Sequence, residues 1–358
     1  MGEDRGPDRM DAGGSVGTGR VKGFNVTPGR FGHEPVAIVE GDGCVVTIAH
    51  RGATLLRWLQ STGTLETDLS DGYANAAELI EQNGVRNGIL APFPNRIALG
   101  RYEFAGSSYD LLPGQPDNDR LIYHGFLREL PTNLTNVQTG QDSAELTFAC
   151  DSIRPGAFPG YPFALDIRLI YEITASSIDL TVHVHNVGEH AAPYAAGWHP
   201  YFRLGTESID ELELTIPAQS VIRTTPDLIP LSGAEAHGLP AIDAPDFREA
   251  RPIGEAVLDT CYSNLVPDDD GISRTLLSNP RTGQSLEILQ DNGHMHVFTA
   301  DTLGRDRRRS IALEPVEVIT NSFNRADLVE HITLAPDSHR SFRCSVRYRA
   351  TLVEPGGH

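Results

Sequence analysis

Hydrophobic and polar residues alternate along several short segments of this chain. In residues 178–186, the aliphatic side chains of Ile178, Leu180 and Val182 fall on one face of an extended strand, with polar side chains between them. Alternation with a period of two is the pattern of a β-strand that buries one face. Alternation of this kind, or aliphatic runs bounded by glycine, predicts strands at residues 36–39, 43–49, 53–59, 144–149, 163–173, 177–187, 285–289, 295–300 and 340–352.

Helical periodicity is scarce, and residues 76–82 are the short helix or turn that the pattern favours. Gly and Pro, with 35 and 24 residues, exceed their average share, which favours short strands joined by tight turns. Loops rich in Pro, Asp and Gly are expected at residues 113–118, 153–162, 234–246 and 267–272. We therefore expect an all-β fold, a large antiparallel β-sandwich, in which residues 26–354 form a single domain.

The first 25 residues are rich in glycine and charge. Such a segment cannot bury enough apolar surface to order itself, so we expect residues 1–25 to form a disordered tail. This tail has no apolar core of a secretory signal, and no later segment is long and apolar enough to span a bilayer. The cysteines have no C-x-x-C spacing, which is typical of reduced thiols: Cys44, Cys150, Cys261 and Cys344. These features predict a cytoplasmic protein.

The net charge is strongly negative, because 48 acidic and 29 basic side chains give -19 at pH 7. An acidic surface repels phosphate backbones and anionic lipid headgroups, so neither nucleic acid nor a membrane is an expected partner. A neutral sugar is not excluded on this ground. The sequence makes no prediction of the oligomeric state.

Two clusters in the first half of the chain could bind a ligand. Arg96, beside Asn95, stands just before an extended segment, where its fork of donors could hold a planar polar group. Alternatively, it is a surface arginine next to a turn-forming asparagine. His124 is followed by Gly125, which lets a ligand approach the backbone closely. Alternatively, it is an ordinary hydrogen-bonded histidine.

Two further clusters bring in aromatic rings and a carboxylate. His199 lies in the run from Trp198 to Phe202, where rings could pack on the C–H faces of a sugar, although an aromatic core cluster would look similar. Glu314 is expected to end an apolar strand, and it is followed by Pro315. Because strands rarely bury an unpartnered carboxylate, this position is unusual. Burial raises the pKa of a carboxyl towards neutrality, where it can act as a general base.

A competing pattern is His183-Val-His185 with Glu189, which resembles the metal-binding run of cupins. Both histidines project from one side of a strand, a geometry suited to two metal ligands. No glycine stands five residues upstream and no second motif follows, so a polar sheet face is the preferred interpretation. His294 and His296 share the spacing and receive the same interpretation. No metal site is therefore predicted.

Taken in order along the chain, the four clusters resemble the aldose 1-epimerase (galactose mutarotase-like) family. Asn95-Arg96-Ile97 is similar to the start of the family's Asn-Arg-Ile-x-x-Gly segment, and His124-Gly125 to its first His-Gly. His199-Pro-Tyr-Phe202 is similar to its second histidine motif, and Leu313-Glu314-Pro315 to its C-terminal glutamate motif. Asp259 stands where the family carries an aspartate that binds sugar hydroxyls. The resemblance covers most of the chain.

This resemblance implies a function, namely interconversion of the α and β anomers of a free aldohexose such as glucose or galactose. It implies no metal or organic cofactor, since the reaction moves only protons. Glu314 would be the general base at the O1 hydroxyl, and His199 the general acid at the ring oxygen O5. His124 would steady the charge on the ring oxygen, and the substrate-binding residues would be Arg96, Asn95 and Asp259.

Two other functions stay open on the sequence alone. A hexose-6-phosphate 1-epimerase on the same fold would need a basic cluster for the phosphate. The candidates are arginines that a solvated, charged loop would explain as well: Arg305, Arg307, Arg308 and Arg309. A non-catalytic sugar-binding β-sandwich would leave the pair of Glu314 and His199 unexplained.

Overall fold

The N-terminal part of the chain folds into an antiparallel meander. The structure is a computed structural model that describes residues 23–62, 65–205 and 208–350. Each strand of this N-terminal sheet pairs with the next in the chain, in the order β1 (Asn25–Phe31), β2 (Glu34–Gly41), β3 (Cys44–Ala49), β4 (Leu55–Thr62) and β5 (Leu65–Asp68). In β3 the aliphatic side chains of Val46 and Ile48 are fully buried.

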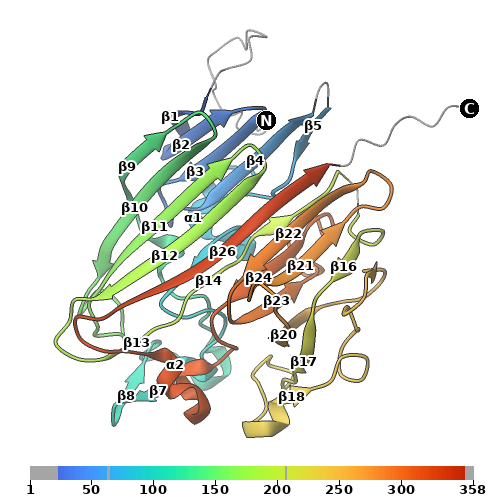
Figure 1. Cartoon of the computed structure of the whole chain (residues 1–358). Coiled ribbons are helices and arrows are strands. Elements are labelled where there is room, and N and C mark those ends of the chain that lie inside the picture. Colours follow the sequence, from blue (N-terminus) through green and yellow to red (C-terminus); the bar gives the residue numbers. More distant parts are fainter. Residues whose placement is uncertain (1–22, 63–64, 206–207, 351–358) are drawn as a thin grey trace, which may run out of the picture.

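A large sheet crosses the front of the molecule in the view of Figure 1. Its strand order is β19–β16–β21–β22–β26–β12–β11–β10–β9, so the C-terminal strand lies against a strand from the middle of the chain. The strands are β9 (Asn133–Thr139), β10 (Ser143–Ile153), β11 (Leu165–Thr174), β12 (Ser177–Asn186), β16 (Glu213–Thr215), β19 (Arg251–Pro252), β21 (Ser273–Ser278), β22 (Gln284–Gln290) and β26 (His339–Ala350).

A third sheet, here called the site sheet, lies behind the large one. Its order is β18–β17–β20–β23–β24–β14–β6, and β15 also pairs with β24. The strands are β6 (Ile89–Leu90), β14 (Gly197–Trp198), β15 (Tyr201–Phe202), β17 (Ala218–Ile222), β18 (His237–Gly238), β20 (Asp259–Leu265), β23 (His294–Phe298) and β24 (Ile311–Val316). Smaller elements complete the fold: the pairs β7 (Arg101–Phe104) with β8 (Ser107–Asp110) and β13 (Ala192–Pro193) with β25 (Thr333–Leu334), and the helices α1 (Ala76–Glu81) and α2 (Val329–Ile332).

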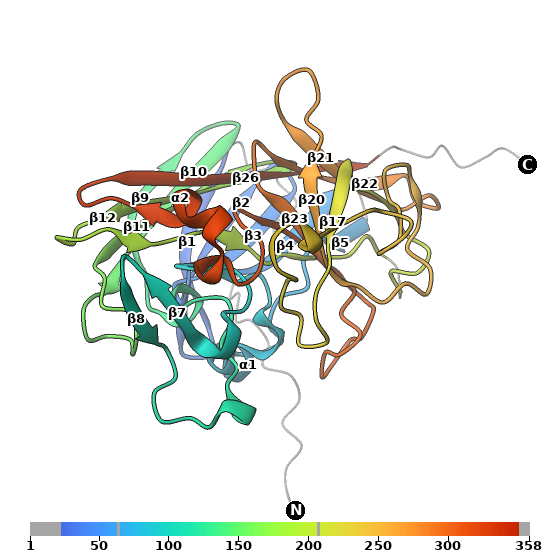
Figure 2. The same ribbon diagram turned by 90° about the horizontal axis from the view of Figure 1, so that it is seen from below.

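The large sheet packs face to face on the other two sheets, as Figures 1 and 2 show from two directions. One continuous apolar cluster fills the space between them, with Val46 from the N-terminal sheet, Leu180 from the large sheet and Val297 from the site sheet. The hydroxyl of Tyr171 also crosses the layers, donating to the carbonyl oxygen of Ala53 at 2.8 Å. The predicted all-β, antiparallel sandwich is confirmed.

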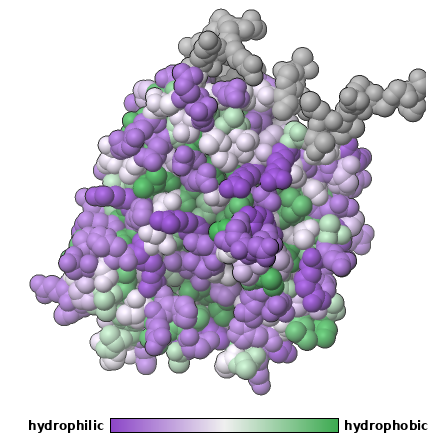
Figure 3. All heavy atoms as spheres, in the orientation of Figure 1, coloured by the Kyte–Doolittle hydropathy of each residue, from purple (hydrophilic) through white to green (hydrophobic). Residues whose placement is uncertain are grey.

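The outer face of the large sheet is polar, as expected from the alternation in β12. Its aliphatic residues point into the core, whereas Thr181, His183 and His185 are half-buried on the other side. Figure 3 shows that hydrophilic residues predominate over this side of the molecule. No helix in the described ranges is long and apolar enough to cross a membrane.

The predicted elements agree with the observed ones, with shifts at their ends. Each predicted strand overlaps an observed strand, and the short helix predicted at residues 76–82 is α1. The tail predicted for residues 1–25 lies outside the described residues except at its end, where Phe24 is buried and Asn25 begins β1. Glu314 was expected to end its strand. Instead β24 continues through Pro315 to Val316, because both sides of the strand are paired there.

Candidate functional site

A cavity of about 690 Å³ opens at the site sheet. Its polar lining comes from three strands of that sheet, from the loops that follow β6 and β14, and from the loop that carries His124. All six residues proposed from the sequence line it, together with one histidine that was assigned elsewhere: Asn95, Arg96, His124, His199, Asp259, Glu314 and His296. The structure thus brings together side chains that lie up to 219 positions apart in the sequence.

At the centre of the cavity wall, His199 contacts Glu314. The imidazole Nε2 lies 3.2 Å from the carboxyl Oε1, and both side chains are almost fully buried. The strand pairing explains this contact. Gly197 is opposite Val316, and Tyr201 is opposite Ala312, so the residue midway between the two short strands comes opposite Glu314.

Burial shifts the pKa values of this pair in opposite directions. Desolvation raises the pKa of Glu314 to about 8, although the positive charge of His296 opposes the rise. Desolvation, followed by the charge of His296, lowers the pKa of His199 to about 3. Both shifts favour the uncharged forms, a protonated carboxyl and a neutral imidazole. The contact between them allows the carboxyl proton to pass to the imidazole.

The imidazole of His199 is held by rings on two sides. It stacks on Tyr201 with centroids 5.0 Å apart, and it meets the ring of His124 edge-on at 5.2 Å. Its Nδ1 has no hydrogen-bond partner on any other residue in the described part of the chain. Packing, and not a second hydrogen bond, therefore orients this ring.

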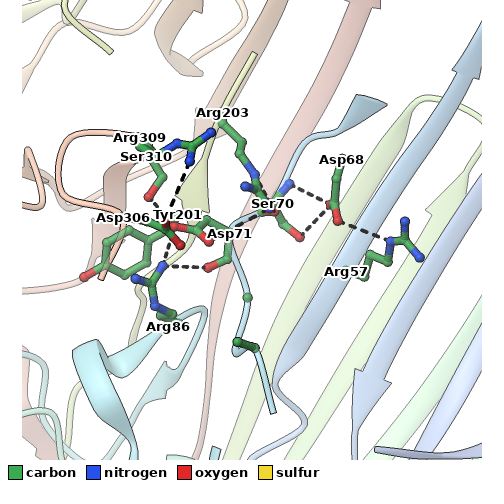
Figure 4. Close-up of polar contacts among 12 residues, drawn as sticks. Arg57, Asp68, Ser70, Asp71, Arg86, Tyr201, Arg203, Asp306, Arg309 and Ser310 are labelled. Atoms are coloured by element: carbon green, nitrogen blue, oxygen red, sulfur yellow. Dashed lines mark hydrogen bonds and ion pairs between the residues drawn. The ribbon is translucent and has the colours of Figure 1, made fainter. Parts of the chain in front are cut away.

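Behind Tyr201 lies a buried network of charges, shown in Figure 4. The guanidinium of Arg86 is 5.4 Å from the centre of the Tyr201 ring and forms an ion pair with Asp71, both side chains being 2% exposed. Ser310 donates its hydroxyl to the same carboxylate at 2.6 Å. The Tyr201 hydroxyl donates to the carbonyl oxygen of Gly84 at 2.9 Å. These contacts fix the ring on which His199 stacks.

His124 reaches the cavity from a left-handed backbone conformation, with φ of 64°. Its Nδ1 accepts the backbone N–H of Asn95 at 3.1 Å. Desolvation lowers the pKa of His124 well below the usual range, with a further contribution from the neighbouring His199. A neutral imidazole that accepts at Nδ1 carries its proton on Nε2, so His124 offers an N–H donor to the cavity.

Gly125 allows the loop of His124 to lie against the loop of Asn95. The backbone N–H groups of Phe126 and Leu127 both donate to the carbonyl oxygen of Ala91, at 2.8 and 3.0 Å. A Cβ atom at Gly125 would lie 2.1 Å from that oxygen, and φ of +62° favours glycine as well. The requirement for glycine after His124 is therefore one of backbone packing.

Asn95, Arg96 and Asp259 form a polar rim. The Asn95 side-chain oxygen accepts from the Arg96 backbone N–H at 2.8 Å and from Arg96 Nη1 at 3.2 Å. Arg96 Nη2 lies 3.8 Å from Asp259 Oδ2. Burial raises the pKa of Asp259, but the hydrogen bond and charge of His296 outweigh it, so the pKa is lowered and the group is a carboxylate. The rim thus offers both donors and acceptors to hydroxyl groups.

Sequence reasoning missed His296, which it placed on a polar sheet face. The side chain is 9% exposed, lines the cavity, and has Nε2 2.7 Å from Asp259 Oδ1. A signal was present in the sequence, because the strand of His296 comes directly before the strand of Glu314. Alternation gives each strand one face that can point to the same side as the face of its neighbour. What the sequence could not supply is the register that pairs the two residues.

A known family matches most of this chain. The sequence profile of the family described as aldose 1-epimerase matches residues 35–347. The chain belongs to the aldose 1-epimerase family.

Individual relatives are distant. An uncharacterized protein of Escherichia coli K12, YihR, is 26% identical over 237 residues, which cover 66% of this chain and 71% of that protein. A galactose mutarotase-like protein from Clostridium acetobutylicum has a TM-score of 0.77 at 15% identity, over 92% of this chain and 100% of that one. Galactose 1-epimerase from Lactobacillus acidophilus has a TM-score of 0.75 at 16% identity, over 91% and 98%. At these identities the solved structures establish a shared fold.

His183 and His185, the first pair of histidines considered as metal ligands, lie apart from the cavity. His183 Nδ1 is 2.6 Å from the Ser341 hydroxyl, and His185 stacks on His339 and contacts Asp337 at 2.9 Å, all on the outer face of the large sheet. Within the described ranges, no group of three or more His, Cys, Asp or Glu side chains is arranged to hold a metal ion.

The arginines considered for a phosphate are already bound within the protein. Arg305 lines the cavity, but three carboxylates lie around its guanidinium: Glu78, Asp71 and Asp306. Arg308 is paired with Asp210 and Asp301. Arg307 donates to the Leu303 carbonyl oxygen, and Arg309 lies 3.8 Å from Asp306. A phosphate would have to displace these partners, so the arrangement does not favour a phosphorylated sugar.

Proposed function

We propose that this protein is an aldose 1-epimerase that interconverts the α and β anomers of a free aldohexose. The observation that carries the proposal is the buried contact of His199 with Glu314, 3.2 Å long, in a polar cavity of about 690 Å³. A pKa of about 8 for the carboxyl and of about 3 for the imidazole favours a protonated carboxyl beside a neutral imidazole. Anomer exchange needs one base and one acid at the same time.

The proposed reaction moves protons only. Transfer of the carboxyl proton from Glu314 to His199 prepares a carboxylate and an imidazolium. Glu314 then takes the proton of the O1 hydroxyl, and His199 gives its proton to the ring oxygen O5 as the C1–O5 bond breaks. Rotation about C1–C2 presents the other face of the aldehyde. The two protons return by the same route as the ring closes, so the pair ends in its initial state.

The remaining residues would hold the sugar. The Nε2–H of His124 and the guanidinium of Arg96 are the donors for oxygen atoms that gain negative charge when the ring opens. The carboxylate of Asp259 and the side-chain amide of Asn95 would accept and donate hydrogen bonds to hydroxyl groups. The proposal therefore assigns proton transfer to Glu314 and His199, and sugar binding to the other polar residues of the cavity wall.

Mutarotation is the direct test. We expect purified protein to accelerate the change in optical rotation of freshly dissolved α-D-glucose or α-D-galactose, and Glu314→Gln to lower kcat by about 10²- to 10⁴-fold, as for loss of a general base. Glu317→Gln is the matched control. Glu317 is also partly buried, but it lines another cavity and its carboxylate accepts from the Ala196 backbone N–H. This variant should keep wild-type activity.

The outcomes separate the alternatives. No acceleration with either sugar, but acceleration with glucose 6-phosphate, would indicate the phosphosugar epimerase. Binding of a sugar by calorimetry without any acceleration would indicate a non-catalytic sugar-binding protein. Wild-type activity in Glu314→Gln would remove Glu314 from the mechanism.

A further inference from the structure

His296 lies in a row of cavity-facing residues on three neighbouring strands. In the register of the site sheet, His296 of β23 is opposite Glu314 of β24 on one side and Cys261 of β20 on the other. Asp259 is two residues before Cys261, so it lies diagonally across from His296 on the same face. The backbone itself therefore places the imidazole between two carboxyl groups.

The imidazole contacts one of these carboxyl groups directly. Its Nε2 donates to Asp259 Oδ1 at 2.7 Å. The other oxygen, Oδ2, lies 3.8 Å from Arg96. Asp259 is thus held from two sides, with about a third of its side chain left exposed to the cavity. The imidazole therefore fixes the orientation of the carboxylate that sugar hydroxyls would meet.

The same imidazole carries charge. Burial lowers the pKa of His296, but the negative charge of Glu314 and the hydrogen bond to Asp259 outweigh it, so the net pKa is raised well above its ordinary value. In return, the charge of His296 lowers the pKa of Glu314. Without it, the carboxyl would hold its proton more tightly and would be a poorer source of carboxylate.

We propose that His296 is a positioning residue for anomer exchange, which fixes the Asp259 carboxylate for sugar hydroxyls and supplies the positive charge that lets Glu314 ionise. This inference rests on the proposed function. It assigns two effects to one side chain, and these effects are separable: the hydrogen bond governs sugar binding, and the charge governs the chemical step.

The titratable and charged groups that face His296 come from β20, β24 and the cavity loops: Asp259, Cys261, Glu314, His199, His124 and Arg96. Burial keeps the two other histidines neutral, since their pKa values are lowered. The charge of Arg96 is directed at Asp259. The charge of His296 therefore acts on both carboxyl groups: it lowers the pKa of Asp259 and it lowers the pKa of Glu314.

Two substitutions separate the two effects. His296→Gln keeps an N–H donor for Asp259 but removes the charge. We expect its KM to stay within about threefold of wild type and its kcat to fall about tenfold. In wild type the rate should fall in alkali near pH 8, the pKa of Glu314. In His296→Gln this fall should move up by about one pH unit, because the pKa of Glu314 rises. His296→Leu removes the donor as well. Its KM should rise about 10- to 100-fold, as expected for a charged hydrogen bond left unmade.

His294→Gln is the matched control. His294 is two residues away on the same strand and face, but it lines another cavity and bonds to the Ser263 hydroxyl. This variant should keep both kinetic constants and the pH profile.

The measurements are kcat, KM and the pH–rate profile by polarimetry, with thermal unfolding to confirm that each variant is folded. A wild-type profile in His296→Gln, or an unchanged KM in His296→Leu, would overturn the inference while leaving the proposed function in place. If His296→Leu does not fold, the pH profile of His296→Gln decides alone. An inactive wild type would remove both proposals.

Discussion

At the scale of single residues, Glu314 makes the stability of the fold depend on pH. Its carboxyl is 2% exposed, and its pKa is about 8 in the folded chain against 4.5 for an ordinary glutamate. The folded state therefore binds this proton more tightly than the unfolded state. The resulting stability is fully present below pH 4.5 and is lost as the pH rises to about 8.

A glutamine at this position cannot ionise, so Glu314→Gln should lose activity and gain stability in mild alkali. At pH 8 we expect its free energy of unfolding to exceed that of wild type, by on the order of 3 kcal/mol, and at pH 5 the difference should be small. Urea unfolding at the two pH values measures this. Equal differences at pH 5 and pH 8 would show that Glu314 is not protonated in the folded chain at neutral pH.

Two pairs of histidines show what residue patterns can and cannot predict. His183 with His185 and His294 with His296 have the same spacing, and each pair lies in a strand. Alternation correctly predicts that each pair shares one side of its strand. It does not tell which layer that side meets: the first pair is on the outer face of the large sheet, and His296 lines the cavity. That difference comes from tertiary packing.

At the scale of elements, the site depends on short strands and tight loops. Individual strands were predictable because half-buried strands alternate. The two-residue strands β14 and β15, which carry His199 to Glu314, are too short to show a period. Pro315 also suggested an early end to β24, whereas the strand runs on because its neighbours still pair with it. Local patterns therefore pointed to residues that line the cavity, but they did not predict the short strands that align these residues.

The loop at His124 provides an element-scale prediction. Gly125→Ala would place a Cβ atom 2.1 Å from the Ala91 carbonyl oxygen, so the loop must move and His124 with it. We expect kcat to fall by about 100-fold, because small displacements of a catalytic group have effects of this size. The free energy of unfolding should fall by about 2 kcal/mol or more. Polarimetry and urea unfolding measure the two effects.

Gly114→Ala separates packing from backbone strain in this experiment. Gly114 also has a positive φ, of +83°, but a Cβ atom there would meet nothing within 4 Å. The control variant should lose about 1 kcal/mol of stability and keep its activity. If both variants behaved alike, the close approach of the two loops would not matter for the site.

At the scale of the whole molecule, the sandwich follows from the alternating pattern, but the joining of distant segments does not. β12 pairs along its length with β26, whose residues lie about 160 positions later, as in His183 opposite Ser341. Many registers would bury the same faces, and a sequence pattern alone does not choose between them. The sequence pattern also did not predict the charged network behind Tyr201. Its residues come from segments that are adjacent only in the folded chain.

Asp71 is the centre of that network, and it links the end of the N-terminal sheet to loops around the site sheet. Its side chain is 2% exposed, and Arg86, Arg203 and Ser310 lie around the carboxylate in Figure 4. Arg305 Nη1 is a further neighbour, 3.5 Å from Oδ1. Burial raises the pKa of Asp71, but the charge of Arg86 and the hydrogen bond from Ser310 outweigh it, and the net pKa is lowered. Within the part of the chain that the structure describes, Asp71 is the one carboxylate that forms an ion pair with the buried guanidinium of Arg86.

Asp71→Asn keeps the shape of the side chain but leaves the Arg86 guanidinium buried without its counter-charge. We expect the free energy of unfolding to fall by about 3–5 kcal/mol, the effect of breaking a buried ion pair. Glu211→Gln is the control, because the pair of Glu211 with Arg281 is 58% and 67% exposed and should contribute about 0–1 kcal/mol. Urea unfolding compares them. If Asp71→Asn were no more destabilising than Glu211→Gln, the network could not be what holds Tyr201, and through it His199, in place against Glu314.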